Sequence, residues 1–112
     1  VDNNGLQAMG EIKGILSLDR LMEKVMSFGW KVLEVNGHDY EAIKDVWNVD
    51  WENSWSSDNI TATESNNVKN TPLIMICNTI KGKGVSFMEG DNFYHYANLT
   101  EDIYKKALAE LI

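Results

Sequence analysis

The chain has 112 residues, of which 44% are hydrophobic and 24% are charged. This length fits one domain with one core, and the composition excludes the disordered and collagen-like classes. A formal net charge of -7 argues against nucleic acid as a partner, because binding to a phosphate backbone depends on clusters of Lys and Arg. A single cysteine cannot form an internal disulfide, so we expect a cytoplasmic protein.

No stretch of the sequence predicts a membrane segment. The apolar run around Cys77 is far shorter than the roughly 18 residues that a spanning helix needs, and the first residues lack a basic-then-apolar signal region. We expect Cys77 to be a buried, inert thiol within this run.

The first half of the chain predicts a strand end, a helix, a strand and a second helix. The opening VDNNGLQ is typical of a strand that ends in a turn. Residues 17–28 predict a helix with Ser17 as its cap and Gly29 as its stop, and WKVLEV at 30–35 predicts a buried strand. After the turn at 36–39, Asp39 is expected to cap a helix that reaches Val46 or Trp47, with Tyr40, Ile43, Val46 and Trp47 on its inner stripe.

The second half begins with a long polar segment at residues 48–70. A connection of this length is usually functional or faces a partner, and Trp51 and Trp55 indicate that it packs either on the same chain or on another subunit. Pro72 then starts the most hydrophobic strand, at 73–80, which leads directly into Lys-Gly-Lys-Gly. Thr100 is expected to cap a last helix whose apolar stripe comprises Ile103, Tyr104, Ala107, Leu108 and Leu111.

Alternating strands and helices in this order indicate an α/β fold with a parallel sheet and flanking helices. Because only two or three strands are visible and a parallel sheet needs both faces covered, we expect a domain truncated at its N-terminus.

Ligands of open parallel sheets bind beyond the carboxyl ends of the strands, which directs attention to residues 2–10, 36–39 and 81–84. The glycine loop at 81–84 matches neither the P-loop pattern nor the dinucleotide fingerprint, in which Phe87 would have to be Gly. Asn3, Asn4 and the carbonyls around Gly5 and Leu6 offer the oxygen ligands of a Mg²⁺ ion that also binds phosphate. Simpler interpretations stay open: a plain turn for residues 2–5, a helix-start residue for His38, a packed imidazole for His95, and solvated side chains for Lys81 and Lys83.

Four blocks of the sequence, in order, resemble one protein family. They are VDNNGLQ, FGWKVLEVNGHD, TPLIMICNTIKGKGVSFME and YHYANLTEDIYKKALAEL. Together they are similar to the second half of the thiamine-diphosphate-binding domain of transketolases, above all of the bacterial type that is split into two shorter chains. The resemblance implies that residues 1–112 are the C-terminal part of this domain.

The resemblance also implies site residues. The family's bipartite cofactor motif begins with Gly-Asp-Gly, which would lie upstream, and ends in a segment like residues 2–5. Asn4 would then give its side-chain oxygen and Leu6 its backbone carbonyl to Mg²⁺, and the upstream Asp would be the charged ligand. His95 matches the His of a loop that closes over the cofactor and contributes to proton movements, although Tyr96 replaces the Gly that follows it in the family. Lys81 falls at a cofactor-side position where larger transketolases often have Ile.

The implied activity is transfer of a two-carbon ketol unit from a ketose phosphate to an aldose phosphate with Mg²⁺ and thiamine diphosphate. The implied partners are sugar phosphates and a pyrimidine-domain subunit in a homo- or hetero-oligomer, since that domain holds the glutamate that activates the cofactor. We expect the 112-residue piece to be inactive alone. Alternatives are another thiamine-diphosphate enzyme, such as a deoxyxylulose-phosphate synthase or a 2-oxoacid dehydrogenase component, and a noncatalytic α/β assembly module. An upstream Gly-Asp-Gly would favour the enzyme over the module.

Overall fold

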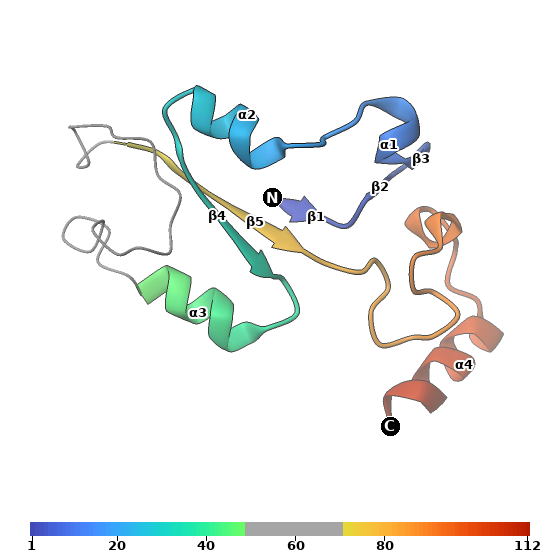
Figure 1. Cartoon of the computed structure of the whole chain (residues 1–112). Helices are drawn as coiled ribbons and strands as arrows, with labels where there is room; N and C mark the ends of the chain where they lie inside the picture. The colour runs from blue at the N-terminus through green and yellow to red at the C-terminus, as the bar shows by residue number, and fades with distance from the viewer. Residues whose placement is uncertain (49–70) are drawn as a thin grey trace. The chain divides into compact units, whose positions relative to one another are not determined.

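The computed structural model describes residues 1–48 and 71–112 (Figure 1). The predictions about a packed polar segment with Trp51 and Trp55 therefore concern residues outside the described ones. The chain divides into two compact units, one formed by residues 1–3 and 19–78 and the other by residues 4–18 and 79–112. No helix among the described residues is long and apolar enough to cross a membrane.

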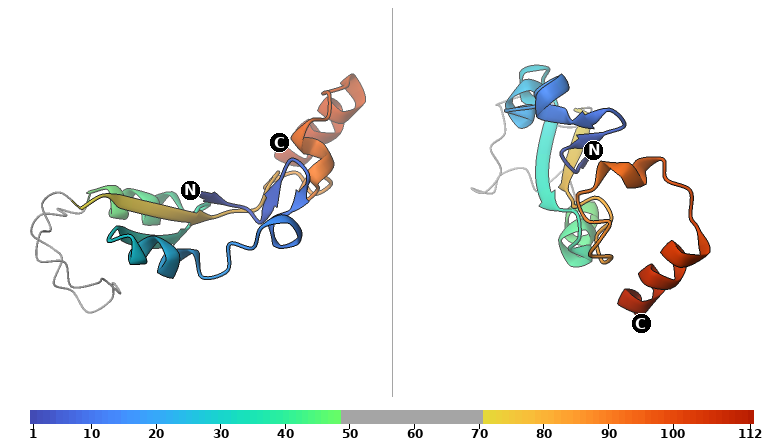
Figure 2. Two further views of the ribbon diagram at one scale, coloured as in Figure 1. Left: turned by 90° about the horizontal axis from the view of Figure 1, so that it is seen from above. Right: turned by 90° about the vertical axis from the view of Figure 1, so that its right-hand side faces the viewer.

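The first unit is built on a three-stranded sheet. Its strands are β1 (Asp2–Asn3), β4 (Lys31–Asn36) and β5 (Leu73–Asn78), and their order is β1-β5-β4. β5 is parallel to both neighbours, and β4 and β5 run side by side over their whole length (Figures 1 and 2). The parallel α/β architecture predicted from the alternation of elements is confirmed.

Among the described residues, two helices lie between the strands of this sheet along the chain. Helix α2 (Leu21–Ser27) lies between β1 and β4, and α3 (Tyr40–Asn48) follows β4. The connection from β1 to β4 and the connection from β4 back to β5 run in opposite directions along the sheet, so right-handed crossovers put α2 and α3 on opposite faces. Val32 and Ile76, which share one face through their register, are 3% and 2% exposed and form the centre of the core.

Helix α2 begins later than its sequence predicts. Ser17 is not its cap, because the helix starts at Leu21 and is preceded by Arg20 in the left-handed conformation, with φ of 60°. The predicted stop is confirmed, since Gly29 has φ of 79° and its N–H donates to the carbonyl of Met26 at 2.8 Å. Glycine adopts this positive φ without the steric cost that other residues incur.

Helix α3 has the predicted cap but not the whole predicted stripe. The Asp39 carboxylate accepts from the N–H groups of Glu41 and Ala42 at 3.1 and 3.0 Å. Tyr40 is 83% exposed, so its place on the inner stripe was wrong: at the first position of the helix its side chain lies outside the contact with the sheet.

The second unit opens with a hairpin that the sequence did not predict. Strands β2 (Leu6–Gln7) and β3 (Gly10–Glu11) are antiparallel, and the short helix α1 (Ile12–Ile15) follows. The two-residue turn between the strands is Ala-Met, and the positive φ is at Gly10, with 134°. The turn therefore lacks the Asn-Gly or Asp-Gly signal of common two-residue hairpins.

The rest of the second unit consists of a loop and two helices. β5 ends at Asn78 rather than at residue 80, and a turn-rich loop leads to the 3₁₀ helix η2 (Asn92–His95) and then to α4 (Glu101–Leu111). Thr100 caps α4 as predicted, with its hydroxyl accepting from the Ile103 N–H at 3.3 Å. Cys77 is free and only half-buried, so the prediction of a fully buried thiol was wrong.

Candidate functional site

The two residues proposed as magnesium ligands lie in the second unit, at the start of the hairpin. Asn4 comes directly before Gly5, which has φ of 74°, and Leu6 is the first residue of β2. The Asn4 side-chain oxygen Oδ1 accepts a hydrogen bond from the Leu6 N–H at 2.9 Å. This arrangement is an Asx turn. It is compatible both with a plain turn and with Asn4 as a metal ligand.

The register of the hairpin shows which way the main chain of Leu6 points. The Ile12 N–H donates to the Gly5 carbonyl at 2.9 Å, and Gln7 and Gly10 flank the turn. In an antiparallel pair, the main-chain N–H and C=O groups of successive residues alternate between pointing at the partner strand and pointing away from it. Leu6 stands opposite Glu11, between the pair Gly5–Ile12 and the pair Gln7–Gly10. The Leu6 N–H therefore points away from β3, toward Asn4, and its carbonyl points to the same outer edge.

The oxygen atoms at this edge fit a magnesium ion that obtains its charged ligands elsewhere. Mg²⁺ prefers oxygen ligands and is often bound by few protein groups together with phosphate oxygens. Among residues 1–48 and 71–112 there is no group of three or more His, Cys, Asp and Glu that could hold a metal ion. Asn4 and Leu6 thus offer two neutral oxygens of a partial site.

His95 lies on an element that packs against this hairpin. It is the last residue of η2 and is exposed, and η2 contacts β2 within the second unit. The Asn92 side-chain amide donates to the Ala8 carbonyl at 3.1 Å, which ties η2 to the turn of the hairpin. The fold therefore places the helix that carries His95 beside the strand that begins with Leu6.

Lys81 opens a closed loop in the same unit. Its carbonyl accepts from the Gly90 N–H at 2.9 Å, and within the loop Lys83 forms an ion pair with Glu89 at 3.7 Å. Glu89 also accepts from the Gly84 N–H at 3.0 Å. Lys81 thus has a structural role through its backbone, and Lys83 is paired rather than only solvated.

Aromatic contacts join this loop to η2. Phe87 and Tyr94 meet edge to face with ring centres 5.7 Å apart, and Phe93 and Tyr96 do so at 5.8 Å. Tyr96, which the sequence resemblance aligns with a Gly, has φ of −134° and needs no left-handed backbone. The replacement therefore keeps an ordinary backbone conformation and adds an aromatic ring, 67% exposed, next to His95.

In the first unit, three asparagines stand in register at the carboxyl ends of the three strands. Asn78 pairs in register with Asn3 on one side and with Asn36 on the other. The Asn3 amide donates to the Asn78 side-chain oxygen at 2.7 Å, and the Asn78 amide donates to the Glu34 carboxylate at 2.6 Å. Sequence reasoning missed Glu34 and Asn78, although each lies in or next to a predicted strand end.

His38 belongs to the turn before α3, as the structural interpretation predicted. Its N–H donates to the Asn36 side-chain oxygen at 3.0 Å, and the Asp39 N–H donates to the Asn36 carbonyl at the same distance. His38 lies in the first unit, whereas Asn4, Leu6, Lys81 and His95 all lie in the second.

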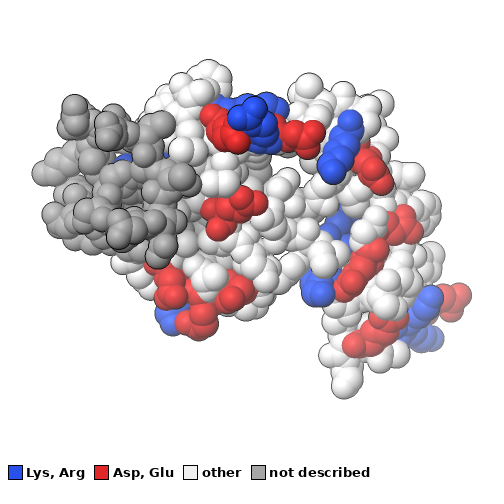
Figure 3. Space-filling view, in the orientation of Figure 1, with Lys and Arg blue, Asp and Glu red and all other residues white. Residues whose placement is uncertain are grey.

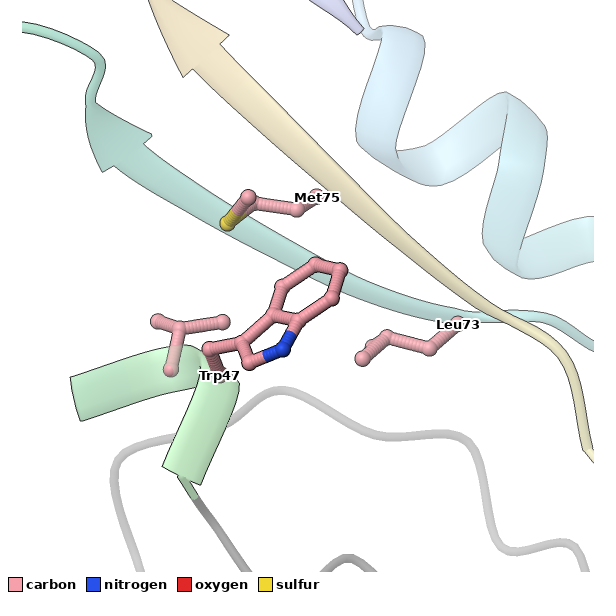
Figure 4. A pocket seen from close by; sticks show the side chains of 4 residues that line it. Trp47, Leu73 and Met75 are labelled. Carbon is pink, nitrogen blue, oxygen red and sulfur yellow. The ribbon is translucent and has the colours of Figure 1, made fainter. Parts of the chain in front are cut away.

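A cavity of about 310 Å³ lies between α3 and β5 in the first unit. Its lining is apolar, and Figure 4 shows the Trp47 indole lying near Leu73 and Met75. Val46 also lines the cavity, so two members of the predicted stripe of α3 do face the sheet, although Trp47 is 77% exposed. These four lining residues include no cation that could bind a phosphate.

Charged side chains of both signs are interspersed on the face of the described residues in Figure 3. Of the described groups, Arg20 has a raised pKa, because its guanidinium is hydrogen-bonded to the Glu23 carboxylate and attracted by its charge. Both side chains are exposed, and the pair lies outside the hairpin region.

No protein-family model matches the chain. Among curated proteins it is 32% identical over 112 residues to the A subunit of the apulose-4-phosphate transketolase of Phocaeicola vulgatus, covering 99% of this chain and 34% of that protein. It is 34% identical over 111 residues to the 6-deoxy-6-sulfo-D-fructose transketolase subunit SqwG of a Clostridium species, with 98% and 34% covered. It is also 32% identical over 102 residues to the transketolase of Buchnera aphidicola, covering 90% of this chain and 13% of that protein.

The similarity to the two subunits extends over nearly the whole chain, while the chain spans about a third of their length. Over nearly its whole length the chain is therefore homologous to part of proteins named as transketolase subunits.

Proposed function

We propose that the chain supplies part of the Mg²⁺ and thiamine diphosphate site of a transketolase that transfers a two-carbon ketol unit between sugar phosphates. The observation that carries this proposal is the shared outer edge of the hairpin, where the Asn4 side chain and the Leu6 carbonyl lie on one side. The similarity to relatives that are named as transketolases supports the cofactor assignment.

In this proposal Asn4 and Leu6 bind the magnesium ion through oxygen, and the cofactor's diphosphate together with an upstream Asp completes the shell. The half-buried Lys81 contributes a positive charge on the diphosphate side. When bound, thiamine diphosphate supplies a carbon nucleophile that takes up and releases the two-carbon unit. His95, exposed at the end of η2, holds and transfers a proton at a substrate hydroxyl.

The partner in this proposal is a pyrimidine-domain subunit, which would hold the glutamate that activates the cofactor. Two of the relatives are named as transketolase subunits, which supports an assembly of two kinds of chain. The proposed substrates are a ketose phosphate donor and an aldose phosphate acceptor. Because two relatives are named for apulose 4-phosphate and 6-deoxy-6-sulfo-D-fructose, both sugars belong in the test panel.

The metal site is tested by calorimetry with Mg²⁺ and thiamine diphosphate on the complete protein mixed with its pyrimidine-domain partner. Asn4→Ala is expected to remove magnesium-dependent cofactor binding, because it deletes the side-chain oxygen. Asn98→Ala, at an exposed position of the same unit, serves as the matched control and should bind like the wild type. Unchanged affinity in Asn4→Ala would rule out the ligand role.

The catalytic assignment is tested by ketol transfer over the sugar panel. His95→Ala should lower kcat while the apparent Kd of the cofactor stays close to that of the wild type, because the lost group acts on substrate protons. A wild-type rate in this variant would return His95 to a packing role. Absence of ketol transfer by the wild-type assembly with every sugar would favour the noncatalytic module.

A further inference from the structure

β1 delivers the chain to the proposed magnesium ligands, because Asn3, its last residue, directly precedes Asn4. β1 pairs with β5, and its main-chain bonds to that strand include the Cys77 N–H, which donates to the Val1 carbonyl at 2.8 Å.

Side chains at the carboxyl ends of the strands link β1 to the other two strands of the sheet. Asn3 donates to Asn78 at 2.7 Å, and Asn78 donates to Glu34 at 2.6 Å, so the hydrogen bonds cross all three strands of the sheet. The second bond is assisted by the charge of the carboxylate and is therefore the stronger one.

The direction of this chain of bonds is set by Glu34. An ionised carboxylate can only accept, so the Asn78 amide must turn its NH₂ group toward Glu34 and its oxygen toward Asn3. Asn3 in turn must present its NH₂ group to Asn78. The charge on β4 thereby fixes the orientation of a side chain on β1, two strands away.

We propose that the hydrogen-bonded chain from Asn3 through Asn78 to Glu34 holds the end of β1 so that Asn4 is positioned for magnesium, with Asn78 as the positioning residue. Only two soft dihedral angles per residue separate Asn3 from Asn4, so fixing the former restricts the path of the latter. This inference rests on the proposed magnesium site and concerns three residues that are not themselves ligands.

The test reverses the donors in the complete protein with its pyrimidine-domain partner. Asn78→Asp removes the donor that faces Glu34 and places two like charges together. It should weaken Mg²⁺ binding, measured by titration at saturating thiamine diphosphate, by about threefold to tenfold, as expected for one lost charge-assisted hydrogen bond. Adding Glu34→Gln restores a donor opposite the carboxylate introduced at position 78, so the double variant should return to within about twofold of the wild type.

Asn36→Asp is the matched control. It makes the same chemical change in the same row, keeps the oxygen that accepts from the His38 N–H, and lies outside the proposed chain of bonds. Its magnesium affinity should stay within about twofold of the wild type, since the charge near the site changes equally. Asn78→Ala gives a second variant, which breaks both bonds without adding charge and should weaken Mg²⁺ binding to a similar extent.

A readout without metal separates positioning from a general loss of stability. In the metal-free protein, Asn78→Asp should speed hydrogen exchange of the Leu6 amide, which is bonded to Asn4, more than that of Lys31, which is bonded to the Pro72 carbonyl at 2.9 Å in the sheet. Equal acceleration at both amides would overturn the proposal, as would wild-type magnesium affinity in Asn78→Asp and Asn78→Ala or failure of the double variant to recover. If Asn4→Ala also leaves magnesium affinity unchanged, the proposed function itself fails; if only the Asn78 variants do, the positioning role alone fails.

Discussion

Gly82 is the position at which one added methyl group should damage the loop that begins at Lys81. A Cβ atom on Gly82 would lie 2.5 Å from the Met88 carbonyl oxygen and 2.7 Å from its carbonyl carbon. Both are backbone atoms, so no rotamer change relieves the clash, and φ of 73° adds the cost of a left-handed residue. We expect Gly82→Ala to lower the free energy of unfolding by about 2–4 kcal/mol, of which about 1 kcal/mol comes from φ and the rest from the clash.

Gly90→Ala is the matched control at the other end of the same loop. Its φ is 69°, close to that of Gly82, but an added Cβ would meet nothing within 4 Å. Gly90→Ala should lower the free energy of unfolding only by the conformational cost of a left-handed residue, about 1 kcal/mol. Urea unfolding measures both values, and hydrogen exchange of the amide at position 90 reports opening of the loop locally. Equal decreases in the free energy of unfolding in the two variants would show that the close approach to Met88 does not contribute to the destabilisation by Gly82→Ala.

Three further substitutions test the contacts around the candidate site and the sheet. Asp39→Ala should destabilise the protein by about 1 kcal/mol in thermal unfolding, because two N–H groups of α3 lose their acceptor, whereas Asp39→Asn should retain most of the stability. Asn92→Leu removes the bond to the Ala8 carbonyl and should speed proteolytic cleavage in the hairpin, and an unchanged cleavage rate would show that η2 does not secure the turn. Tyr96→Gly removes an exposed ring beside His95 and should change KM for sugar phosphates while leaving the cofactor's Kd unaltered; identical KM values across the panel would exclude Tyr96 from the substrate site.

The parallel sheet was predictable because its two long strands carry a strong local signal. WKVLEV and LIMICN are short apolar runs bounded by turn residues, and both became strands within one or two residues of the predicted limits. The caps at Asp39 and Thr100 followed from the preference of these side chains for helix N-termini. In each case the determining interaction joins residues close in sequence.

The hairpin and the start of α2 could not be predicted because their local sequences carry a weak or misleading signal. β2 and β3 have two residues each, too few to show alternation, and their Ala-Met turn carries no turn signal. Helix α2 starts after Arg20 in a conformation that is uncommon for a residue other than glycine, so Ser17 and the spacing of apolar residues pointed to an earlier start. The bonds of Asn78 to Asn3 and Glu34 span 75 and 44 positions, and no local pattern encodes such contacts.

As a proposed magnesium ligand, the outward-facing carbonyl of Leu6 affects how relatives are compared and how position 6 is mutated. A ligand atom that every amino acid carries leaves no trace in residue identity, so alanine scanning of position 6 would keep the oxygen and miss its part in the proposed site. What preserves such a ligand is the path of the main chain, set here by Gly5 and by the pairing of β2 with β3. A proline or an inserted residue in the hairpin would remove it, and comparisons of relatives should weigh hairpin length above the side chain that follows Gly5.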